Sequence, residues 1–380
     1  MAEDPAKKRF LTAVINPGGT STKVACFEGE KEIFSQDIRH EPEELKQFES
    51  VYDQLDWRME KTRECFLQHG VSPASLDAVI GRGGPVAPVP GGTFAVDEAM
   101  LAAIREQRVM VVHPSLLGAP MAHKLAAEGG CPAYIADPVS VDEFVEEARL
   151  TGLPEIPRRA LSHALSVKAT ALKAAAEMGR PLEELNLVVV HLGSGTTVAA
   201  QKNGRQVDST DASASGPMAP TRAGNLPALD LVRLCFSGKY NQKELQKLLV
   251  GSGGWTAHLK TDDLRVIYKQ IDEGDQKARL VLDATLLQIA KEIAAMAVSL
   301  GGKPDAIVLT GGVTRSERFV AELKERVAWI SERVFVFSGD DEMNALASAA
   351  MRTLETTRKT GAGPRSMAPY IEKFKLVEKN

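Results

Sequence analysis

Two stretches of the chain share one pattern, and this repetition constrains the fold more than any other feature. Each has an apolar run, a turn rich in glycine and hydroxyl side chains, and a second apolar run, at residues 14–25 and again at 188–198. Each pattern predicts a tight β-hairpin whose tip presents backbone N–H groups and hydroxyls to an anion. Because the two stretches lie just under half the chain apart, we expect a duplicated fold that binds a nucleotide between its halves.

Composition narrows the class of protein. A chain of 380 residues is too long for one ordinary core and predicts two domains. Its net charge of −4 offers no basic surface to nucleic acid or to an anionic membrane. No run approaches the roughly 18 apolar residues of a membrane span, and the charged residues 1–8 do not resemble a signal peptide. The four cysteines lack disulfide or metal spacing, so we expect reduced thiols in a cytoplasmic protein.

The order of predicted elements is similar in the two halves: three strands, then helices alternating with two more strands. This order predicts an α/β protein, with a helix at 160–178 between the halves and a surface tail without clear periodicity at 359–380. The predicted strands are 10–15, 22–27, 31–37, 77–80, 133–136, 187–192, 196–201, 206–209, 306–309 and 334–337. The predicted helices are 51–69, 97–107, 116–128, 160–178, 226–236, 242–249, 276–300, 316–327 and 342–356.

Glycines follow several predicted strands. Glycine at a hairpin tip lets the backbone approach a phosphate, although one such hairpin alone is equally typical of an ordinary turn. Gly311 and Gly312 follow a strand and precede a helix, where open α/β sheets bind ligands, although a simple strand-to-helix turn would also use them. The glycine-rich loop 251–254 predicts either a helix C-cap or a wall beside a nucleotide base.

Charged residues also lie at the ends of predicted strands and in the turns and helix starts near them. Arg82 and Arg222 have small neighbours, which suits bidentate binding of a carboxylate, although a solvated arginine is the simpler alternative. Asp137 follows a short strand, where acids hold metal ions or orient phosphoryl groups, but Asp-Pro also favours turns. The acidic run 340–342 opens a helix, where the helix dipole alone attracts acids. The histidines show no metal-ligand spacing, and no Walker A sequence is present.

Taken together, these residues resemble the butyrate kinase family, which belongs with acetate kinase to the superfamily of sugar kinases, Hsp70 and actin. The similarity extends from about residue 11 to about residue 351 and is specific as an ordered set. It implies an α/β protein of two duplicated ribonuclease H-like (actin-like ATPase) domains with a nucleotide cleft between them. Domain one would be 1–155, on the substrate side, and domain two 156–340, on the nucleotide side, with 341–380 packing back as a helix plus tail. The matching pieces are 16–23, 81–84, 191–195, 221–227, 309–312 and 340–343.

The resemblance also implies a role for each matching position. Arg82 and Arg222 would hold the carboxylate and the transferring phosphoryl group, with Asp137 and His163 as the other catalytic residues. Magnesium would be held by Asn16, Asp137 and Glu342, directly or through water. The expected ATP contacts are Asn16, Gly18, Thr20, Ser21, Thr22, Lys23, His191, Gly193, Ser194, Gly195, Gly311 and Gly312.

The chain departs from the family pattern at four positions. Leu116 stands where the family usually has asparagine, Ser166 where it has asparagine, Ser194 where it has glycine, and Met218 where it has phenylalanine. The changes at Leu116, which follows His113, and at Met218 bear on the acyl pocket, so they concern the choice of acid more than the reaction. We expect that pocket to have apolar walls, with the loop 85–90 and the Leu116 region deciding its size.

The predicted reaction is in-line transfer of the ATP γ-phosphoryl group to butyrate, which gives butanoyl phosphate and ADP. A carboxylic acid is already ionised at pH 7, so the reaction needs charge neutralisation rather than a general base. One alternative is a kinase for another short-chain acid such as acetate, propionate or isobutyrate. Others are an Hsp70- or actin-like ATPase without an acyl substrate, and a sugar-kinase-related repressor. The family resemblance also predicts a homo-oligomer.

Overall fold

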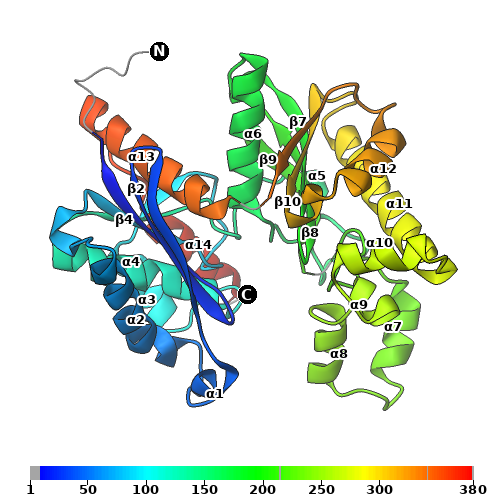
Figure 1. Cartoon of the computed structure of the whole chain (residues 1–380), viewed down its shortest axis with the longest axis horizontal. Helices are drawn as coiled ribbons and strands as arrows, with labels where there is room; N and C mark the ends of the chain where they lie inside the picture. Colours follow the sequence, from blue (N-terminus) through cyan, green and yellow to red (C-terminus); the bar gives the residue numbers. More distant parts are fainter. Residues whose placement is uncertain (1–8, 214, 340, 379–380) are drawn as a thin grey trace. The chain divides into compact units, whose positions relative to one another are not determined.

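The computed structural model describes residues 9–213, 215–339 and 341–378. The segment 1–8 and Asp340, both used above, lie outside the described residues. The chain divides into two compact units, of which unit 1 comprises Met1–Val141 with Asp341–Asn380 and unit 2 comprises Asp142–Asp340. Each unit is built around one sheet, and each is described by itself (Figure 1).

Unit 1 contains a six-stranded sheet in the order β3-β2-β1-β4-β6-β5. The first three strands form an antiparallel meander, and β1, β4 and β6 run parallel to one another. The carboxyl ends of these three strands therefore lie at one edge of the sheet, where α/β folds bind ligands. The strands are β1 (Leu11–Pro17), β2 (Ser21–Glu28), β3 (Lys31–Arg39), β4 (Ala78–Arg82), β5 (Thr93–Ala95) and β6 (Ala133–Ala136).

Unit 2 contains a five-stranded sheet in the order β11-β10-β7-β8-β9. Read from its last member, this order matches that of unit 1 without β5, and β7, β10 and β11 are parallel. The predicted duplication, with a βββ meander and two further parallel strands in each half, is confirmed. The strands are β7 (Asn186–Leu192), β8 (Thr196–Lys202), β9 (Arg205–Ser209), β10 (Ala306–Gly311) and β11 (Val334–Ser338).

Helices cover the sheets. In unit 1 they are α1 (Pro42–Leu45), α2 (Leu55–Gln68), α3 (Glu98–Arg105), α4 (Gly118–Gly129), α13 (Glu342–Thr360) and α14 (Ala368–Glu378). In unit 2 they are α5 (Glu146–Arg149), α6 (Ala164–Met178), α7 (Ala228–Cys235), α8 (Gln242–Leu249), α9 (Gly254–Leu259), α10 (Leu264–Asp272), α11 (Gln276–Ser299) and α12 (Glu317–Val327). Among the described residues, none of these helices combines the length and apolar composition that crossing a membrane needs.

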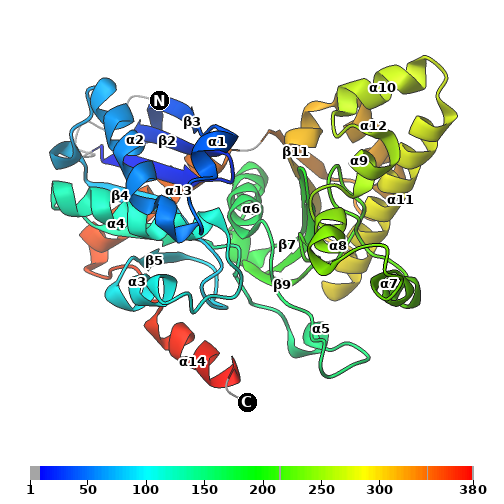
Figure 2. The same cartoon turned by 90° about the horizontal axis from the view of Figure 1, so that it is seen from below.

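The central strands β1, β4, β7 and β10 are buried on both faces, which is why they read as nearly continuous apolar runs, whereas the edge strand β3 is largely exposed. On β1, Ala13 and Ile15 pack with α2 and α4, whereas the residues of opposite parity face α13. On β7, Val188 and Val190 pack with α11 and α12, whereas Val189 packs with α6. Figure 2 shows α6 on one face of the unit 2 sheet and α11 with α12 on the other.

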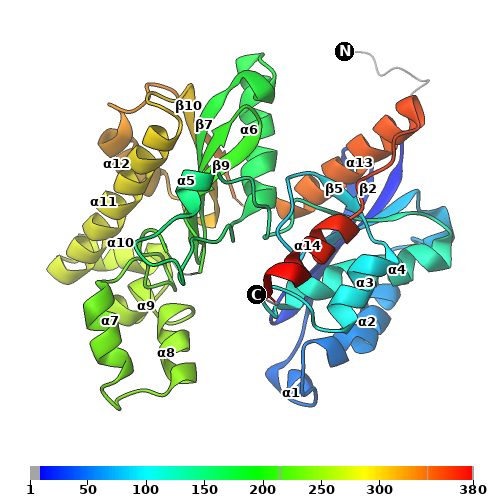
Figure 3. The same ribbon diagram turned by 180° about the vertical axis from the view of Figure 1, so that it is seen from behind.

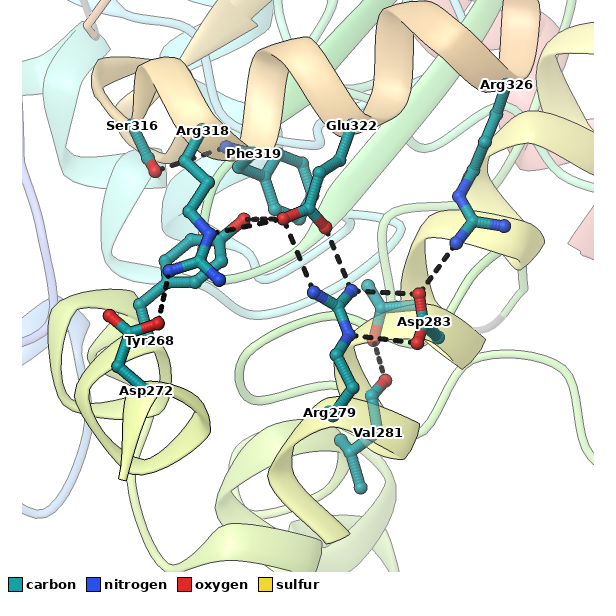
Figure 4. Close-up of polar contacts among 11 residues, drawn as sticks. Tyr268, Asp272, Arg279, Val281, Asp283, Ser316, Arg318, Phe319, Glu322 and Arg326 are labelled. Atoms are coloured by element: carbon teal, nitrogen blue, oxygen red, sulfur yellow. Dashed lines mark hydrogen bonds and ion pairs between the residues drawn. The ribbon is translucent and has the colours of Figure 1, made fainter. Parts of the chain in front are cut away.

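Three helices of unit 2 are joined by a network of ion pairs (Figure 4). Arg279 of α11 bridges Asp283, one turn along the same helix, and Glu322 of α12, each at 2.8 Å. Arg318 of α12 pairs with Asp272 of α10 and lies over the ring of Tyr268. Burial raises the pKa of the Tyr268 hydroxyl, and the negative charge of the nearby Glu322 carboxylate raises it further. The network fixes the helices that cover one face of the sheet.

The boundary between the units differs from the prediction at residue 155. The segment from Asp142 to residue 155 belongs to unit 2 because its backbone attaches to β9. The N–H of Val145 donates to the carbonyl of Val207 at 3.0 Å, and the Glu143 carboxylate accepts from the N–H of Gln206 at 2.8 Å. Composition gave no sign of this attachment, since the segment reads as an ordinary linker.

The prediction of a surface tail without clear periodicity at 359–380 is wrong where this segment forms a helix. Residues 368–378 form α14, which lies beside α3 in unit 1 (Figure 3). Met367 and Ile371 are buried in the cluster that contains Phe94 and Met100. Burial of these two side chains is worth roughly 1.5–3 kcal/mol each, enough to order a segment whose own helix propensity is modest.

Candidate functional site

In unit 1, three predicted residues meet at the carboxyl edge of the sheet. Glu342, the first residue of α13, accepts from the side-chain amide of Asn16 at the end of β1, at 2.8 Å. Its other carboxylate oxygen lies 3.1 Å from Nη2 of Arg82, which ends β4. The side chains of Asn16 and Arg82 both lie on the face of the sheet that α13 covers. The sheet and the helix therefore assemble this polar cluster from segments that are far apart in the sequence.

Arg82 is only partly used by this arrangement. The residue is 5% exposed, and its Nη1 atom is buried without a hydrogen-bond partner among the described residues. An unsatisfied buried N–H of a charged group is costly unless something accepts from it. Glu342 thus fixes one edge of the guanidinium while Nη1 stays available to an anionic ligand, which suits the predicted role of Arg82.

Asp137 lies directly after β6 and next to Arg82 in register, because Arg82 pairs with Ala136. It has a left-handed backbone, with φ of 37°, and is 5% exposed. The Asp137 carboxylate accepts from the N–H of Gly92 at 2.7 Å, and its own N–H donates to the Gly92 carbonyl. The turn chemistry considered as an alternative is therefore present, and it holds the carboxylate at the same edge as Arg82 and Glu342.

The two faces of the first hairpin separate its predicted ligand contacts. Lys23 is exposed and pairs across the strands with Asn16, so the two side chains share the face turned to α13. Thr20 is exposed, and Gly18 and Ser21 are half-buried near the tip. Thr22 has the opposite parity and is fully buried. Its hydroxyl contacts His40 Nε2 at 2.9 Å and accepts from Arg58 at 3.0 Å, so Thr22 is a structural residue rather than a phosphate contact.

Arg58 on α2, which the sequence analysis did not single out, supports the tip of this hairpin from behind. It is fully buried and donates to the carbonyls of Ser21 and Gly19, as well as to Gln54. Burial lowers its pKa to about 10, so it stays protonated near pH 7. By donating hydrogen bonds to these two carbonyls, Arg58 orients the peptide groups of the hairpin tip. A lone arginine in an amphipathic helix gave no signal of this role.

His40 lies beside Arg58 and predicts a pH-dependent loss of stability. Burial first, and then the charges of Arg58 and Lys61, lower the His40 pKa from 6.5 to about 4. Because the folded pKa lies below the unfolded one, the stabilisation is complete above pH 6.5 and is lost as the pH falls from 6.5 through 4. Across that window we expect wild-type protein to lose up to about 3 kcal/mol more unfolding free energy than His40→Gln.

Urea titrations at pH 7, 5.5 and 4.5 measure this difference. His123→Gln is the matched control, since His123 is an exposed histidine of the same unit, and it should follow the wild-type profile. Equal pH profiles for wild-type protein and His40→Gln would contradict the assignment of a neutral, buried imidazole.

The glycines around Arg82 serve backbone packing. A Cβ atom at Gly81 would lie 2.0 Å from the carbonyl oxygen of Gly118, and one at Gly84 would lie 2.7 Å from Leu116. Gly83 would meet Pro138 in the same way. These glycines bring β4 and the start of α4 together, so the Arg82 backbone is held rigidly.

In unit 2, His191 occupies the position on β7 that Asn16 occupies on β1. The His191 ring stacks on that of His163, the residue preceding α6, with ring centres 4.1 Å apart. His163 Nδ1 lies 2.8 Å from the Thr197 hydroxyl, which also accepts from the His163 N–H. Because the His163 N–H donates to the Thr197 hydroxyl, α6 begins at Ala164, whereas the prediction placed its start at residue 160. The two units are alike in this respect. Glu342 at the start of α13 contacts Asn16 of β1, and His163 at the start of α6 contacts His191 of β7.

The second hairpin tip lies against Arg222. The Ser194 carbonyl accepts from both the N–H and the hydroxyl of Thr221, and a Cβ at Gly195 would lie 3.5 Å from Arg222 Nε. That Nε atom is buried without a partner among the residues that the structure describes, and burial lowers the Arg222 pKa. Unit 2 therefore places Arg222 beside the hairpin tip that contains Gly193, Ser194 and Gly195.

The glycine loop 251–254 holds the Arg222 segment in place. Gly254 has φ of 56°, and a Cβ there would lie 1.7 Å from the carbonyl of Ala219. At the end of β10, Gly311 has φ of 95° and contacts the Leu192 backbone, whereas Gly312 is exposed with open space beside it. Gly311 is therefore required by the backbone, and Gly312 is the one of this pair that a nucleoside could approach.

The expected acyl-pocket residues are largely buried. Leu116 is fully buried with Val86 and Val89 of the proline-rich loop, in the cluster around Phe94. Met218 belongs to the core of unit 2 and packs near Trp255. The departures from the family pattern at Leu116 and Met218 thus change core packing. They would affect the binding of an acyl chain only indirectly, through that packing. Ser166 is likewise buried, in α6, where its carbonyl accepts from the Thr170 hydroxyl.

A cavity of about 770 Å³ that the sequence did not predict lies in unit 2 between β9, α11 and the segment 151–159. Its lining is mostly polar and charged, and Arg158 pairs there with Asp208 at 2.8 Å. The cavity therefore does not have the apolar walls expected of an acyl pocket.

Within the described ranges, no three His, Cys, Asp or Glu side chains cluster as a ready metal site. The oxygen donors of Asn16, Asp137 and Glu342 nevertheless suit Mg²⁺, which commonly takes one or two carboxylates together with waters and substrate phosphates. Because Glu342 already accepts from Asn16 and Arg82, water-mediated contact fits its position best.

Comparison with known proteins gives the family. The sequence profile of the acetokinase family matches residues 155–361. A probable butyrate kinase 2 from Caldanaerobacter subterraneus is 45% identical, over 91% of this chain and 97% of that protein. The chain belongs to the acetokinase family. This acetokinase is also 41% identical to a probable butyrate kinase from Clostridium botulinum, over 92% of this chain and 98% of that protein.

The family resemblance drawn from the sequence motifs is thus confirmed. The crystal structure of Porphyromonas gingivalis acetate kinase covers 91% of this acetokinase and 100% of that chain, with a TM-score of 0.75. At 19% identity this likeness concerns the fold, and it agrees with the duplicated α/β architecture described above. The predicted fold class of two ribonuclease H-like domains is confirmed.

Proposed function

We propose that this acetokinase transfers the γ-phosphoryl group of ATP to a short-chain carboxylate, with butyrate as the preferred acid, to give butanoyl phosphate and ADP. The observation that carries the proposal is the guanidinium of Arg82, which Glu342 fixes at Nη2 and whose buried Nη1 has no hydrogen-bond partner among the described residues. The two relatives, both named probable butyrate kinases, support the choice of acid.

In the proposed reaction, a carboxylate oxygen attacks the γ-phosphorus in line, and the bond from that phosphorus to the β–γ bridging oxygen breaks. The acid is ionised at neutral pH, so no proton has to be removed. Arg82 neutralises the two anions as they approach, and Arg222 does so from unit 2. His163, oriented by Thr197 and His191, donates a hydrogen bond to the transferring group. The N–H groups of the two hairpin tips bind the ATP phosphates.

We also propose Mg²⁺ as the metal, held with ATP by Asn16, Asp137 and Glu342. The ion would shield the charge of the β- and γ-phosphates during transfer. Chelation should accordingly abolish turnover, and added Mg²⁺ should restore it.

A panel of acids tests the proposal. ADP release is measured with acetate, propionate, butyrate, isobutyrate and valerate, and the acyl phosphate is trapped with hydroxylamine as a hydroxamate. We expect acid-dependent release with the highest kcat/KM for butyrate. A higher kcat/KM for acetate would overturn the choice of acid alone. ATP hydrolysis that ignores the acid and yields no hydroxamate would instead indicate an ATPase of the Hsp70 or actin kind.

A further inference from the structure

Arg58 of α2 carries a buried charge without an acidic partner among the described residues. The side chain is fully buried, and its five hydrogen bonds within the described chain go to neutral oxygens of Gln54, Thr22, Gly19 and Ser21. Burial lowers the Arg58 pKa to about 10, and no carboxylate of the described residues offsets that effect. Burying a guanidinium is costly unless an opposite charge compensates it. A charge that the fold leaves unpaired in this way is available to a bound anion.

The Arg58 charge lies directly behind the tip of the first hairpin. Arg58 Nη2 donates to the carbonyl of Gly19 at 3.4 Å. Because the C=O and N–H of a trans peptide group point in opposite directions, the N–H of Thr20 points away from Arg58. An anion that accepts from this N–H would lie roughly 8 Å from the guanidinium, with one peptide group between them. The anion would therefore feel both the oriented peptide dipole and the charge behind it.

The second hairpin shows that a tip does not need a charged donor to keep its shape. There the Ser194 carbonyl accepts from the N–H and the hydroxyl of Thr221, which are both neutral donors. A neutral side chain on α2 could hold the carbonyls of the first tip in the same way, without the cost of burying a charge. The positive charge of Arg58 therefore calls for a role beyond holding these carbonyls.

We propose that Arg58 is a positioning residue for phosphate binding, which orients the Gly19–Thr20 peptide group and whose unpaired charge attracts the ATP phosphate at the first hairpin tip. The inference rests on the proposed function, which brings ATP to that tip. At roughly 8 Å and an effective dielectric constant of about 20, the attraction between two unit charges changes a binding constant roughly 30-fold. A phosphate group is charged before and during transfer, so the effect should appear in KM for ATP more than in kcat.

The substitution Gln54→Glu tests the charge without removing Arg58. Gln54 Oε1 accepts from Nε and Nη2 of Arg58, at 3.0 and 2.8 Å, and a glutamate oxygen in its place would keep both contacts and neutralise the guanidinium. We expect an unfolding midpoint in urea at or above that of wild-type protein. The affinity for ADP, measured by isothermal titration calorimetry, should nevertheless fall about 10-fold. If Arg58 only held the tip, its stronger contact with residue 54 would leave ADP affinity equal or higher, and that result would overturn the proposal.

Gln68→Glu is the matched control for this substitution. It adds the same charge at the exposed end of α2, roughly 21 Å along the helix, and should leave ADP affinity unchanged. Arg58→Gln keeps a neutral donor and should lower ADP affinity roughly 30-fold, with a matching rise in KM for ATP and a kcat within about 3-fold of wild type. Arg58→Lys keeps the charge and should recover most of the affinity. Wild-type affinity in Arg58→Gln would also overturn the proposal.

Adenosine separates an effect on phosphate from a general disturbance of the site. Because adenosine has no phosphate, wild-type protein and Gln54→Glu should bind it equally in competition with ADP. A loss of the same size for adenosine and ADP would exclude the proposed electrostatic role. Wild-type protein that binds neither ATP nor ADP would contradict the proposed function itself, whereas equal ADP binding by wild-type protein and Gln54→Glu would remove only the role of the Arg58 charge.

Discussion

Replacing Arg82 by alanine is expected to lower kcat/KM for butyrate at least about 1,000-fold, which corresponds to about 4 kcal/mol. Arg82 supplies a buried positive charge whose Nη1 atom is unsatisfied until a ligand accepts from it. A buried arginine that stabilises a transferring phosphoryl group commonly contributes an effect of this size or more. Most of the loss should appear in kcat, because the charge matters most when the two anions are closest. Steady-state ADP release with varied butyrate measures both parameters.

The Arg82 variant needs a structural control, because the substitution removes the cationic partner of the partly buried Glu342 carboxylate, which still accepts from Asn16. Breaking such a pair can itself cost 3–5 kcal/mol of stability. Unfolding midpoints are therefore compared with Arg63→Ala, which removes an ion pair of the same unit on the exposed side of α2. Partial recovery of kcat on adding guanidinium would support a direct role. Turnover near that of wild-type protein would remove Arg82 from the reaction.

Most of the architecture was predictable because each half uses the same local pattern. The turn residues predict the β-hairpins, and apolar runs such as 187–192 predict the fully buried strands. The attachment of the segment 142–155 to β9 was not predictable, because it depends on the N–H of Val145 donating to the Val207 carbonyl and on the Glu143 carboxylate accepting from the N–H of Gln206. Nothing in side-chain pattern encodes such a contact.

The missed helix α14 is a different kind of error. Met367, Ile371 and Phe374 follow one another at helical spacing, so a signal was present. It was weak because the surrounding residues have mixed charge and only a short apolar stripe. The helix is stabilised by packing on Phe94 and its neighbours, which are more than 250 positions away in the sequence. Tertiary burial thus decided a segment that local propensity left open.

In the candidate site, the sequence predicted the strand ends and the hairpins but not the face on which each side chain lies. The hydroxyl of Thr22 belongs to the right hairpin, but its parity turns it toward Arg58 and His40. A central strand that is buried on both faces has apolar side chains on both. The alternation of apolar and polar residues that usually shows which way a side chain points is therefore absent. Arg58 was missed because it contacts Gln54, Thr22 and two backbone carbonyls of the hairpin tip, and these contacts have no sequence signature.

Replacing Arg222 by alanine is expected to lower kcat/KM about 100- to 1,000-fold. Its Nε atom is buried and without a partner in the described part of the chain, beside the tip at Gly195. The backbone contacts of Ala219 with Gly254 do not involve the Arg222 side chain, so the loop should keep its shape after truncation. Arg205→Ala, an exposed arginine of the same unit, is the control and should retain wild-type kinetics.

The decisive comparison combines the two variants. If Arg82 and Arg222 stabilise the same phosphoryl group in one transition state, the first substitution already removes much of what the second would cost. The double variant should then lose less transition-state free energy than the two single losses together, with a coupling of at least about 1 kcal/mol. Strict additivity would mean that the two guanidinium groups act on separate groups or separate steps. The cycle thus asks, through kinetics alone, whether one reaction uses both units of the chain.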